Sequence, residues 1–280
     1  MLQPMRLDFV KMHGLGNDFI VLELASDATL PTPAQWRALS DRHTGIGFDQ
    51  ALVLQPPRRP GTDIYYRIFN ADGSEVEQCG NGARCVAALL QPRSPERTAP
   101  VTLDSPGGLL RARVLADGRV SVDMGAPNFE PAALPFRAPA RSSSYALQVD
   151  GENLECGAVS IGNPHVVARV AQLEAAPVQR VGQALQRCAL FPRQVNVGFM
   201  QIVDRGHIHL RVYERGVGET LACGTGACAA AVIGRDQGLL DADVEVHVPG
   251  GTLSVHWDGE GESVWLTGPA QRSFDGQVEI

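Results

Sequence analysis

Two cysteines occupy the same unusual setting in the sequence: each is followed by a glycine, a small polar residue and a second glycine. Cys79 begins CGNGARC and Cys223 begins CGTGACA, and a run of small and apolar residues follows each motif. Such a run predicts a helix buried on every side, with the cysteine at its start. The unpaired N–H groups and the dipole of a helix N-terminus favour a thiolate, so either sulfur could act as a base near neutral pH.

Two thiols in equivalent settings suggest one reaction shared between them. If a thiolate removes a proton from one face of a carbon atom and a thiol returns a proton to the other face, the configuration is inverted. The flanking glycines let backbone N–H groups approach a carboxylate, and such donors stabilise a carbanion as it develops. The residues therefore predict an amino acid racemase or epimerase that needs neither pyridoxal phosphate nor a metal, so no cofactor is expected.

The cysteine motif belongs to a longer internal repeat. The segment IYYRIFNADGSEVEQCGNGA from Ile64 aligns with IHLRVYERGVGETLACGTGA from Ile208. Further matches keep the same order: LGNDF with IGNPH, SPGGLLRARV with VPGGTLSVHW, SVDMGAP with VWLTGPA, and IGFDQ ending at Gln50 with VGFMQ ending at Gln201. A duplicated chain explains this order better than chance matches among turn residues.

The repeat divides the chain into two halves. We expect an N-terminal half over 1–123, to which 269–280 return, a C-terminal half over 124–268, and an active site in the cleft between them. Alternating and β-branched segments bounded by glycine turns predict strands and hairpins, with few helices. The predicted fold class is α/β of the α+β kind, with two pseudo-symmetric halves, each a curved, mostly antiparallel sheet wrapped around one central buried helix.

Charge and hydropathy exclude several classes of protein. The net charge of -7 and the pI near 5.5 provide no basic field for a nucleic-acid backbone. No apolar stretch reaches the roughly 18 to 20 residues that span a bilayer, and the N-terminus lacks the apolar region of a secretory signal. We therefore expect a cytoplasmic protein that acts on a small molecule and has neither a nucleic acid nor a membrane as partner.

The six cysteines are too sparse for a disulfide scaffold, and none of their spacings is that of a zinc site, so no metal site is expected. Free cysteine is among the most frequently buried residues. We expect interior packing for the four cysteines outside the two equivalent positions, namely Cys85, Cys156, Cys188 and Cys228.

Taken together, the motifs resemble those of the diaminopimelate epimerase family. The resemblance covers nearly the whole chain and is carried by MHGLGNDF (12–19), GIGFDQ (45–50), RIFNADGSEVEQCGNGARC (67–85), GNPH (162–165), VNVGF (195–199) and YERGVGETLACGTGACA (213–229). It implies the diaminopimelate epimerase-like fold and an isomerase, independent of pyridoxal phosphate, that interconverts LL- and meso-2,6-diaminopimelate in lysine and peptidoglycan biosynthesis. It also implies a homodimer.

The resemblance further implies roles for single residues. The two catalytic cysteines fall on Cys79 and Cys223, and His165 and Glu214 match positions that tune the thiols. Arg215 has the geometry to bind a distal carboxylate through two hydrogen bonds. Substrate contacts are implied for Asn17, Gln50, Asn70, Asn163, Asn196, Glu214 and Arg215, and carboxylate binding through backbone N–H groups for Gly80, Asn81, Gly224 and Thr225.

Three other functions stay open at this point. A two-thiol racemase or epimerase of proline, hydroxyproline or another amino acid would use the same cysteines but would not need Arg215 and several asparagines to recognise a second centre. A thiol redox or metal-binding protein would use Cys79 and Cys223 without any stereochemical activity. A non-catalytic carboxylate-binding module would keep its function when both cysteines are replaced.

Overall fold

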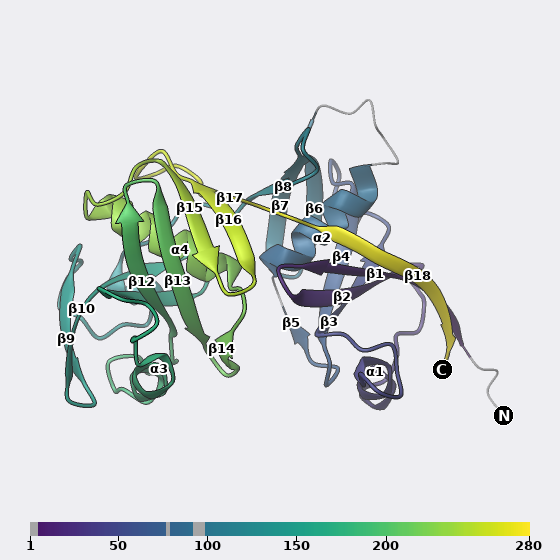
Figure 1. Cartoon of the computed structure of the whole chain (residues 1–280). Helices are drawn as coiled ribbons and strands as arrows, with labels where there is room; N and C mark the ends of the chain where they lie inside the picture. The colour runs from purple at the N-terminus through teal and green to yellow at the C-terminus, as the bar shows by residue number, and fades with distance from the viewer. Residues whose placement is uncertain (1–4, 77–78, 92–98) are drawn as a thin grey trace. The chain divides into compact units, whose positions relative to one another are not determined.

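The structure, a computed structural model, describes residues 5–76, 79–91 and 99–280. The chain divides into two compact units, Met1–Val122 with Gly268–Ile280, and Asp123–Thr267 (Figure 1). Strands dominate both units, and no helix among the described residues has the length and apolar character needed to cross a bilayer.

The described part of the first unit forms a sheet of strands and the helices α1 and α2. Its strands follow the order β18-β1-β2-β3-β4, after which β5 and β6 share the far edge of β4, and β7 and β8 complete the sheet. Among the pairings of the described residues in this unit, β2 with β3 and β4 with β6 are the parallel ones. The elements are β1 (Arg6–Gly14), β2 (Asn17–Glu23), α1 (Pro33–Ser40), β3 (Gln50–Gln55), β4 (Ile64–Asn70), β5 (Glu75–Val76), α2 (Gly80–Leu90), β6 (Val101–Ser105), β7 (Gly108–Val114), β8 (Val120–Asp123) and β18 (Gln271–Glu279).

The second unit repeats this arrangement strand for strand. Its order is β9-β10-β11-β12-β13, then β14 and β15 on the far edge of β13, then β16 and β17. The parallel pairs, β11 with β12 and β13 with β15, correspond in position to β2 with β3 and β4 with β6 of the first unit. The elements are β9 (Tyr145–Val149), β10 (Glu152–Ser160), β11 (Pro164–Arg169), α3 (Val178–Gln186), β12 (Asn196–Asp204), β13 (His207–Glu214), β14 (Gly218–Thr220), α4 (Gly224–Asp236), β15 (Asp243–Val248), β16 (Gly251–His256) and β17 (Trp265–Gly268), with a short 3-10 turn at Pro131–Ala133.

The strand register corrects one match of the internal repeat. Gln50 lies opposite Phe19 in the parallel pair of the first unit, and Asn196 lies opposite His165 in the equivalent pair of the second. The structural counterpart of Gln50 is therefore Asn196, and its alignment with Gln201 is wrong. The sequence match failed because the Gly-Phe step precedes β3 in the first unit, whereas it lies inside β12 in the second.

The central helices α2 and α4 are buried as their composition predicts. In α4 the nine consecutive residues Gly226–Gly234 are all buried, and the helix contacts six strands, β10 to β13, β15 and β16. The helix also packs closely against β10, because a Cβ atom added to Gly157 would lie 2.3 Å from Cγ2 of Ile233. A helix without a polar face has to be covered all round, and the curved sheet provides this cover.

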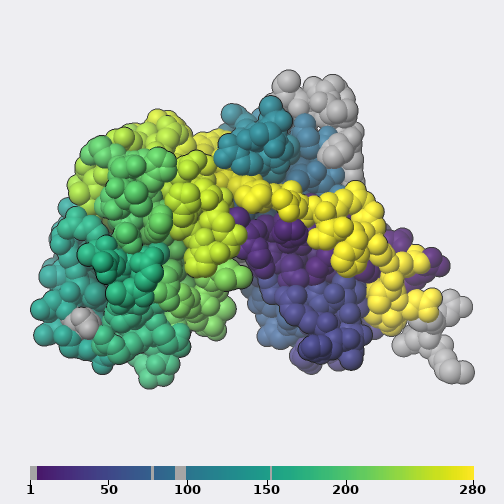
Figure 2. Space-filling model, in the orientation of Figure 1, coloured from purple at the N-terminus to yellow at the C-terminus, as the bar shows by residue number. Residues whose placement is uncertain are grey.

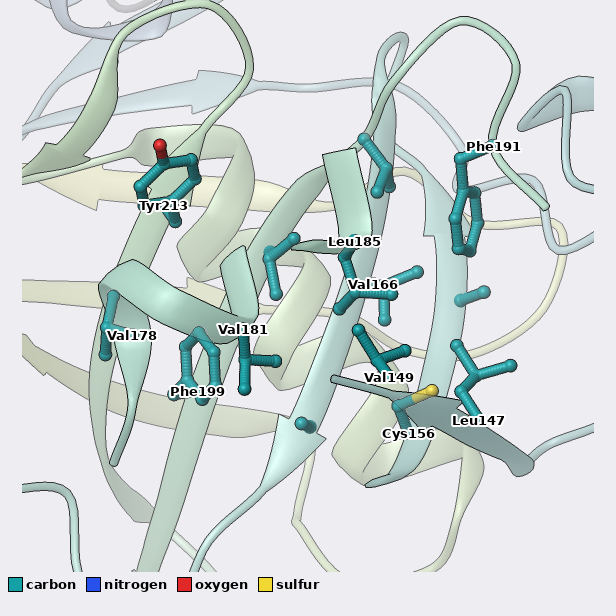
Figure 3. Packing of buried hydrophobic residues seen from close by; sticks show 14 of the residues in the cluster. Leu147, Val149, Cys156, Val166, Val178, Val181, Leu185, Phe191, Phe199 and Tyr213 are labelled. Atoms are coloured by element: carbon teal, nitrogen blue, oxygen red, sulfur yellow. The ribbon is translucent and has the colours of Figure 1, made fainter. Parts of the chain in front are cut away.

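The short helices α1 and α3 pack separately from the central helices, and the sequence patterns did not single them out. Thr32 caps α1 and forms a capping box with Gln35, and Trp36 and Leu39 then join a buried cluster with residues of β1, β2, β3 and β4. In the second unit, Val178, Val181 and Leu185 of α3 lie in the cluster shown in Figure 3, which includes Phe199, Phe191 and Tyr213. Each sheet therefore has buried residues on both faces.

The C-terminal strand completes the sheet of the first unit. β18 pairs antiparallel with β1, from Arg6 opposite Glu279 to His13 opposite Gln271. Backbone hydrogen bonds in both directions between Met5 and Ile280 extend this pairing to the end of the chain. Figure 2 shows β18, in yellow, on the surface of the unit beside the purple N-terminal strand. In the strand order, β18 takes the place that β9 has in the second unit.

We predict that Gly157→Ala lowers the free energy of unfolding by about 1–3 kcal/mol, because the new methyl group overlaps the Ile233 side chain. Urea unfolding measures the change. Adding Ile233→Ala should make the double variant less destabilised than the sum of the two single variants. Gly206→Ala is the control, since its nearest neighbour would lie 3.6 Å away; an equal loss there would contradict the packing argument.

Candidate active site

In the first unit, three polar residues from different strands meet at one edge of the sheet. Asn17 begins β2, Gln50 begins β3, and Asn70 ends β4, which runs antiparallel to β3. The Gln50 Nε2 donates to Asn70 Oδ1 at 2.9 Å, and Asn70 Nδ2 donates to Ser74 Oγ at 3.0 Å. The Gln50 Oε1 is buried and has no hydrogen-bond partner among the described residues. A buried acceptor without a partner is unfavourable and is suited to receive a ligand donor such as an ammonium group.

Cys79 joins this group at the N-terminus of α2. It is the N-cap residue, in extended conformation, and its Sγ accepts the Gly82 N–H at 3.4 Å. The Asn81 Nδ2 donates to Asn17 Oδ1 at 3.2 Å, and Cys79 Sγ lies 4.0 Å from the same oxygen. The first unit therefore brings together Asn17, Gln50, Asn70, Cys79, Gly80 and Asn81.

A cluster of charged side chains supports Asn17. Its Nδ2 donates to Asp49 Oδ2 at 2.9 Å, and Asp49 also accepts from Arg42, which forms two further hydrogen bonds with Asp18. The buried Lys11 Nζ donates to Asp18 at 2.6 Å and to the Gly47 carbonyl oxygen. Burial acts to raise the pKa of Asp18, but Arg42 and Lys11 together hold it at about 2.

In the second unit, the corresponding ends of β11, β12 and β13 carry five candidate residues, namely Asn163, His165, Asn196, Glu214 and Arg215. Asn163 directly precedes β11, Asn196 begins β12, and Glu214 ends β13. The Asn196 side chain is buried and both ends of its amide bind backbone: Nδ2 donates to the Pro164 carbonyl, and Oδ1 accepts the Arg215 N–H. Asn196 thereby fixes the loop that starts at Arg215, whose exposed side chain donates to the Arg193 carbonyl at 3.3 Å.

Cys223 is the N-cap residue of α4 and is buried. Its Sγ lies 3.6 Å from Thr225 Oγ1, and Asn163 Nδ2 donates to that hydroxyl oxygen at 3.3 Å. A Cβ atom at Gly226 would lie 3.2 Å from Sγ, so a larger residue would crowd the thiol. The second unit therefore groups Cys223, Gly224 and Thr225 with Asn163 at the start of α4.

A series of contacts through Asn163 and Thr225 links His165 to the Cys223 thiol. Its Nε2 lies 2.9 Å from Asn163 Oδ1, and because an amide oxygen only accepts, the ring N–H donates. Complete burial, with the positive charge of Arg215, lowers the pKa of His165 to about 3, so the ring is neutral near pH 7.

The environment of Cys223 disfavours its thiolate. Burial first, and then the negative charge of Glu214, raise the pKa of the Cys223 thiol well above its ordinary value. The hydrogen bonds from Thr225 and the Gly226 N–H act in the opposite direction. Glu214 is itself held by the Thr220 hydroxyl, which donates to Oε1 at 2.6 Å.

The other cysteines differ from this pair. Cys85, Cys156 and Cys228 are buried in the interior, and Cys188 is half-buried. Burial raises the pKa of both Cys85 and Cys156 to about 12. These two thiols are therefore protonated near neutral pH and pack as small apolar side chains.

Two matching ion pairs, which the sequence patterns did not indicate, brace the hairpins that lead to the cysteines. Arg67 Nε and Nη2 each donate to Glu75 at 2.7 Å, and Arg211 forms the same two-bonded pair with Glu219. Each pair joins neighbouring strands, β4 with β5 and β13 with β14. The detectable signal was the recurrence of Arg and Glu at the same spacing in both copies of the repeat.

Comparison with known proteins identifies the family. A family model described as diaminopimelate epimerase matches residues 9–130 and 157–273. A diaminopimelate epimerase of Alkalilimnicola ehrlichii is 51% identical over 278 residues, which is 99% of this chain and 100% of the relative. One of Stutzerimonas stutzeri is 50% identical over 276 residues, with the same coverage. The chain belongs to the diaminopimelate epimerase family.

Membership of the diaminopimelate epimerase family confirms the resemblance inferred from the motifs. Among solved structures, a probable proline racemase from Agrobacterium radiobacter matches with a TM-score of 0.71 and 17% identity, covering 97% of this chain and 92% of that one. At this identity the match concerns the fold alone. The sheet-dominated α+β class predicted from the sequence is likewise confirmed.

We predict that Glu214→Gln lowers the pKa of the Cys223 thiol, because a neutral amide no longer opposes the negative thiolate. The rate of iodoacetamide alkylation at Cys223, followed by peptide mass spectrometry across pH, should then rise at lower pH than in the unmodified protein. Glu219→Gln is the control, since this carboxylate binds Arg211 and leaves the Cys223 profile in place. An unchanged profile in Glu214→Gln would refute the electrostatic effect of Glu214.

Proposed function

We propose that this protein interconverts LL- and meso-2,6-diaminopimelate with Cys79 and Cys223 as paired acid and base. The observation that carries the proposal is the repeated setting of the two thiols. Each is the N-cap of a buried central helix, in a chain that matches diaminopimelate epimerases over 99% of its length at about 50% identity. The active site would then form where both thiols reach one substrate carbon from opposite sides.

In the proposed reaction one cysteine is a thiolate and the other a thiol. The thiolate removes the α-proton and becomes a thiol, while the second thiol gives its proton to the opposite face of the same carbon and becomes a thiolate. The configuration is inverted and the proton count is unchanged. The opposite direction uses the two sulfurs in exchanged roles, so the proton transfers require no cofactor.

Stabilisation of the carbanion is assigned to the helix N-termini. The first-turn N–H groups at Gly80 and Asn81, and at Gly224 and Thr225, have no partners within their own helices and are suited to the α-carboxylate. Preorganised donors of this kind contribute about 3–4 kcal/mol each when they face a developing negative charge.

Recognition of the second centre of the substrate is assigned to the polar strand ends. Gln50 has a buried acceptor that suits an ammonium group, and Arg215 has an exposed guanidinium that suits a distal carboxylate. Asn17, Asn70, Asn163 and Glu214 supply further hydrogen-bonding groups, while Asn196 acts through the backbone that carries Arg215. A diaminopimelate epimerase needs such groups because its substrate has amino acid functions at both ends.

The first test is proton NMR of the purified, freshly reduced protein with LL-diaminopimelate in D2O. We expect deuterium at the α-carbon together with formation of the meso isomer. Cys79→Ala and Cys223→Ala should each abolish inversion, because each removes one of the two proton-transfer groups. Cys85→Ala, which changes a buried thiol on the same helix as Cys79, should retain it.

The alternatives give different outcomes in the same assay. Deuterium incorporation into proline or hydroxyproline, but not into diaminopimelate, would show that this protein is a two-thiol racemase of the proline type. A wild-type protein that exchanges no substrate proton, but whose function follows the oxidation state of its thiols, would favour the redox alternative. Full function in both cysteine variants would favour a carboxylate-binding module.

We also infer that the protein is a cytoplasmic homodimer. We place the contact between the two copies at the exposed surface of β18. Phe274 on this strand is 49% exposed and packs edge to face on Phe9, with ring centroids 6.0 Å apart. Light scattering after size exclusion should give about twice the chain mass of 29.9 kDa. Phe274→Glu should reduce this to the mass of the monomer, whereas Glu at the equally exposed Leu109 of β7 should not. A dimer that persists in Phe274→Glu excludes this surface.

A further inference from the structure

A buried arginine lies in the otherwise small and apolar helix α2. Arg84 is 0% exposed, one turn beyond the N-cap Cys79. A guanidinium cannot lose its charge at ordinary pH, so its burial is unfavourable unless hydrogen bonds replace the lost water. Its Nη2 donates to Asn81 Oδ1 at 2.8 Å, and its Nε donates to the Pro269 carbonyl at 3.3 Å.

The hydrogen bond to Asn81 starts a series of hydrogen bonds that passes the sulfur of Cys79 at Asn17 and ends at Asp49. Asn81 Nδ2 donates to Asn17 Oδ1 at 3.2 Å, and Asn17 Nδ2 donates to Asp49 Oδ2 at 2.9 Å. A guanidinium can only donate and an ionised carboxylate can only accept. The groups at the two ends therefore allow the two amides one direction only, from Arg84 through Asn81 and Asn17 to Asp49.

This direction decides which atom faces Cys79. The Asn17 oxygen, not its nitrogen, lies 4.0 Å from Cys79 Sγ and is placed to accept from the thiol. If the amides were reversed, an N–H group would lie there instead and would favour the thiolate. We propose that Arg84 is a positioning residue that orients the Asn17 amide beside Cys79 through the Asn81 side chain.

The second unit lacks this arginine and orients its amide the other way. Cys228 stands in α4 where Arg84 stands in α2, and it cannot supply the same donors. There, His165 donates to Asn163 Oδ1, so the Asn163 nitrogen faces Thr225 and the hydroxyl of Thr225 lies beside Cys223. Cys79 thus lies beside an amide oxygen and Cys223 beside a hydroxyl group, which makes the two thiols chemically different.

The orientation itself is tested without reference to catalysis. The sequence has seven asparagines, so side-chain amide signals of isotope-labelled asparagine can be assigned by single substitutions. Arg84→Met should shift the amide signals of both Asn81 and Asn17 and speed their hydrogen exchange. Cys85→Ala, the neighbouring buried position, should leave them in place. Asn17 signals that do not change in Arg84→Met would overturn the proposal.

The kinetic consequence rests on the proposed function and is measured with diaminopimelate. Arg84→Met should lower kcat/KM by about 10- to 100-fold, because small displacements of positioning groups carry losses of this size. If Arg84 acts through the Asn81 side chain, Arg84→Met combined with Asn81→Ala should lose no more than the worse single variant. Arg84→Lys should recover part of the activity, since an ammonium group can also donate to Asn81.

Multiplying losses in the double variant would show that Arg84 acts on its own and would overturn the proposal. Should Arg84→Met not fold, Asn81→Asp serves instead, because it keeps a partner for the guanidinium but cannot donate to Asn17. Asn81→Asp should shift the Asn17 amide signals and lower kcat/KM. If it does neither, the hydrogen bonds from Arg84 through Asn81 to Asn17 do not position the Asn17 amide, and the proposal is overturned. If wild-type protein epimerises nothing, the proposed function fails, while the amide signals still decide the role of Arg84.

Discussion

The structure depends on one constraint, which is that a helix without a polar face has to be covered on every side. In each unit the sheet provides this cover for α2 or α4. The backbone N–H groups of the first turn have no hydrogen-bond acceptors within the helix, so the N-terminus is the polar end of an otherwise apolar helix. The strand ends that carry Asn17, Gln50 and Asn70 in one unit, and Asn163 and Glu214 in the other, lie at the same edge. A cysteine at the helix start therefore lies beside polar side chains, as do the first-turn residues Asn81 and Thr225.

Duplication preserved this scaffold more strictly than it preserved the side chains around the thiols. Both units have the same strand order, the same parallel pairs, a cysteine at the N-cap of the central helix and an ion pair between arginine and glutamate. The side chains near the sulfurs do not recur. The buried Arg84 is linked to Asn17 through Asn81 in the first unit, whereas the neutral His165 binds Asn163 in the second. Repeating the backbone fixes where the two thiols stand, and unequal side chains decide how each holds its proton.

Much of this could be predicted from the sequence, and the remainder had physical reasons to stay hidden. The apolar runs after Cys79 and Cys223 can only be buried helices, and the repeated Cys-Gly motifs placed both thiols at helix starts. The match of Gln50 to Gln201 failed because two short Gly-Phe segments lie at different positions relative to their strands. The backbone role of Asn196 depends on the parallel pairing of β11 with β12, which joins residues distant in sequence. The helix α1 is short and buries only Trp36 and Leu39, so its pattern was weak, whereas α3 has the helical spacing of Val178, Val181 and Leu185 and could have been predicted.

The place of β18 in the first unit also determines when that unit can be completed. The strand beside β1 comes from Gln271–Glu279, at the far end of the chain, whereas its counterpart β9 in the second unit directly precedes β10. During synthesis the second unit can pair all its strands from one continuous segment, but β1 lacks its β18 partner until Gln271–Glu279 have left the ribosome. An unpaired strand edge is open to wrong partners, and the contact between β1 and β18 forms slowly because it closes a very long loop. The half made first is therefore the half finished last.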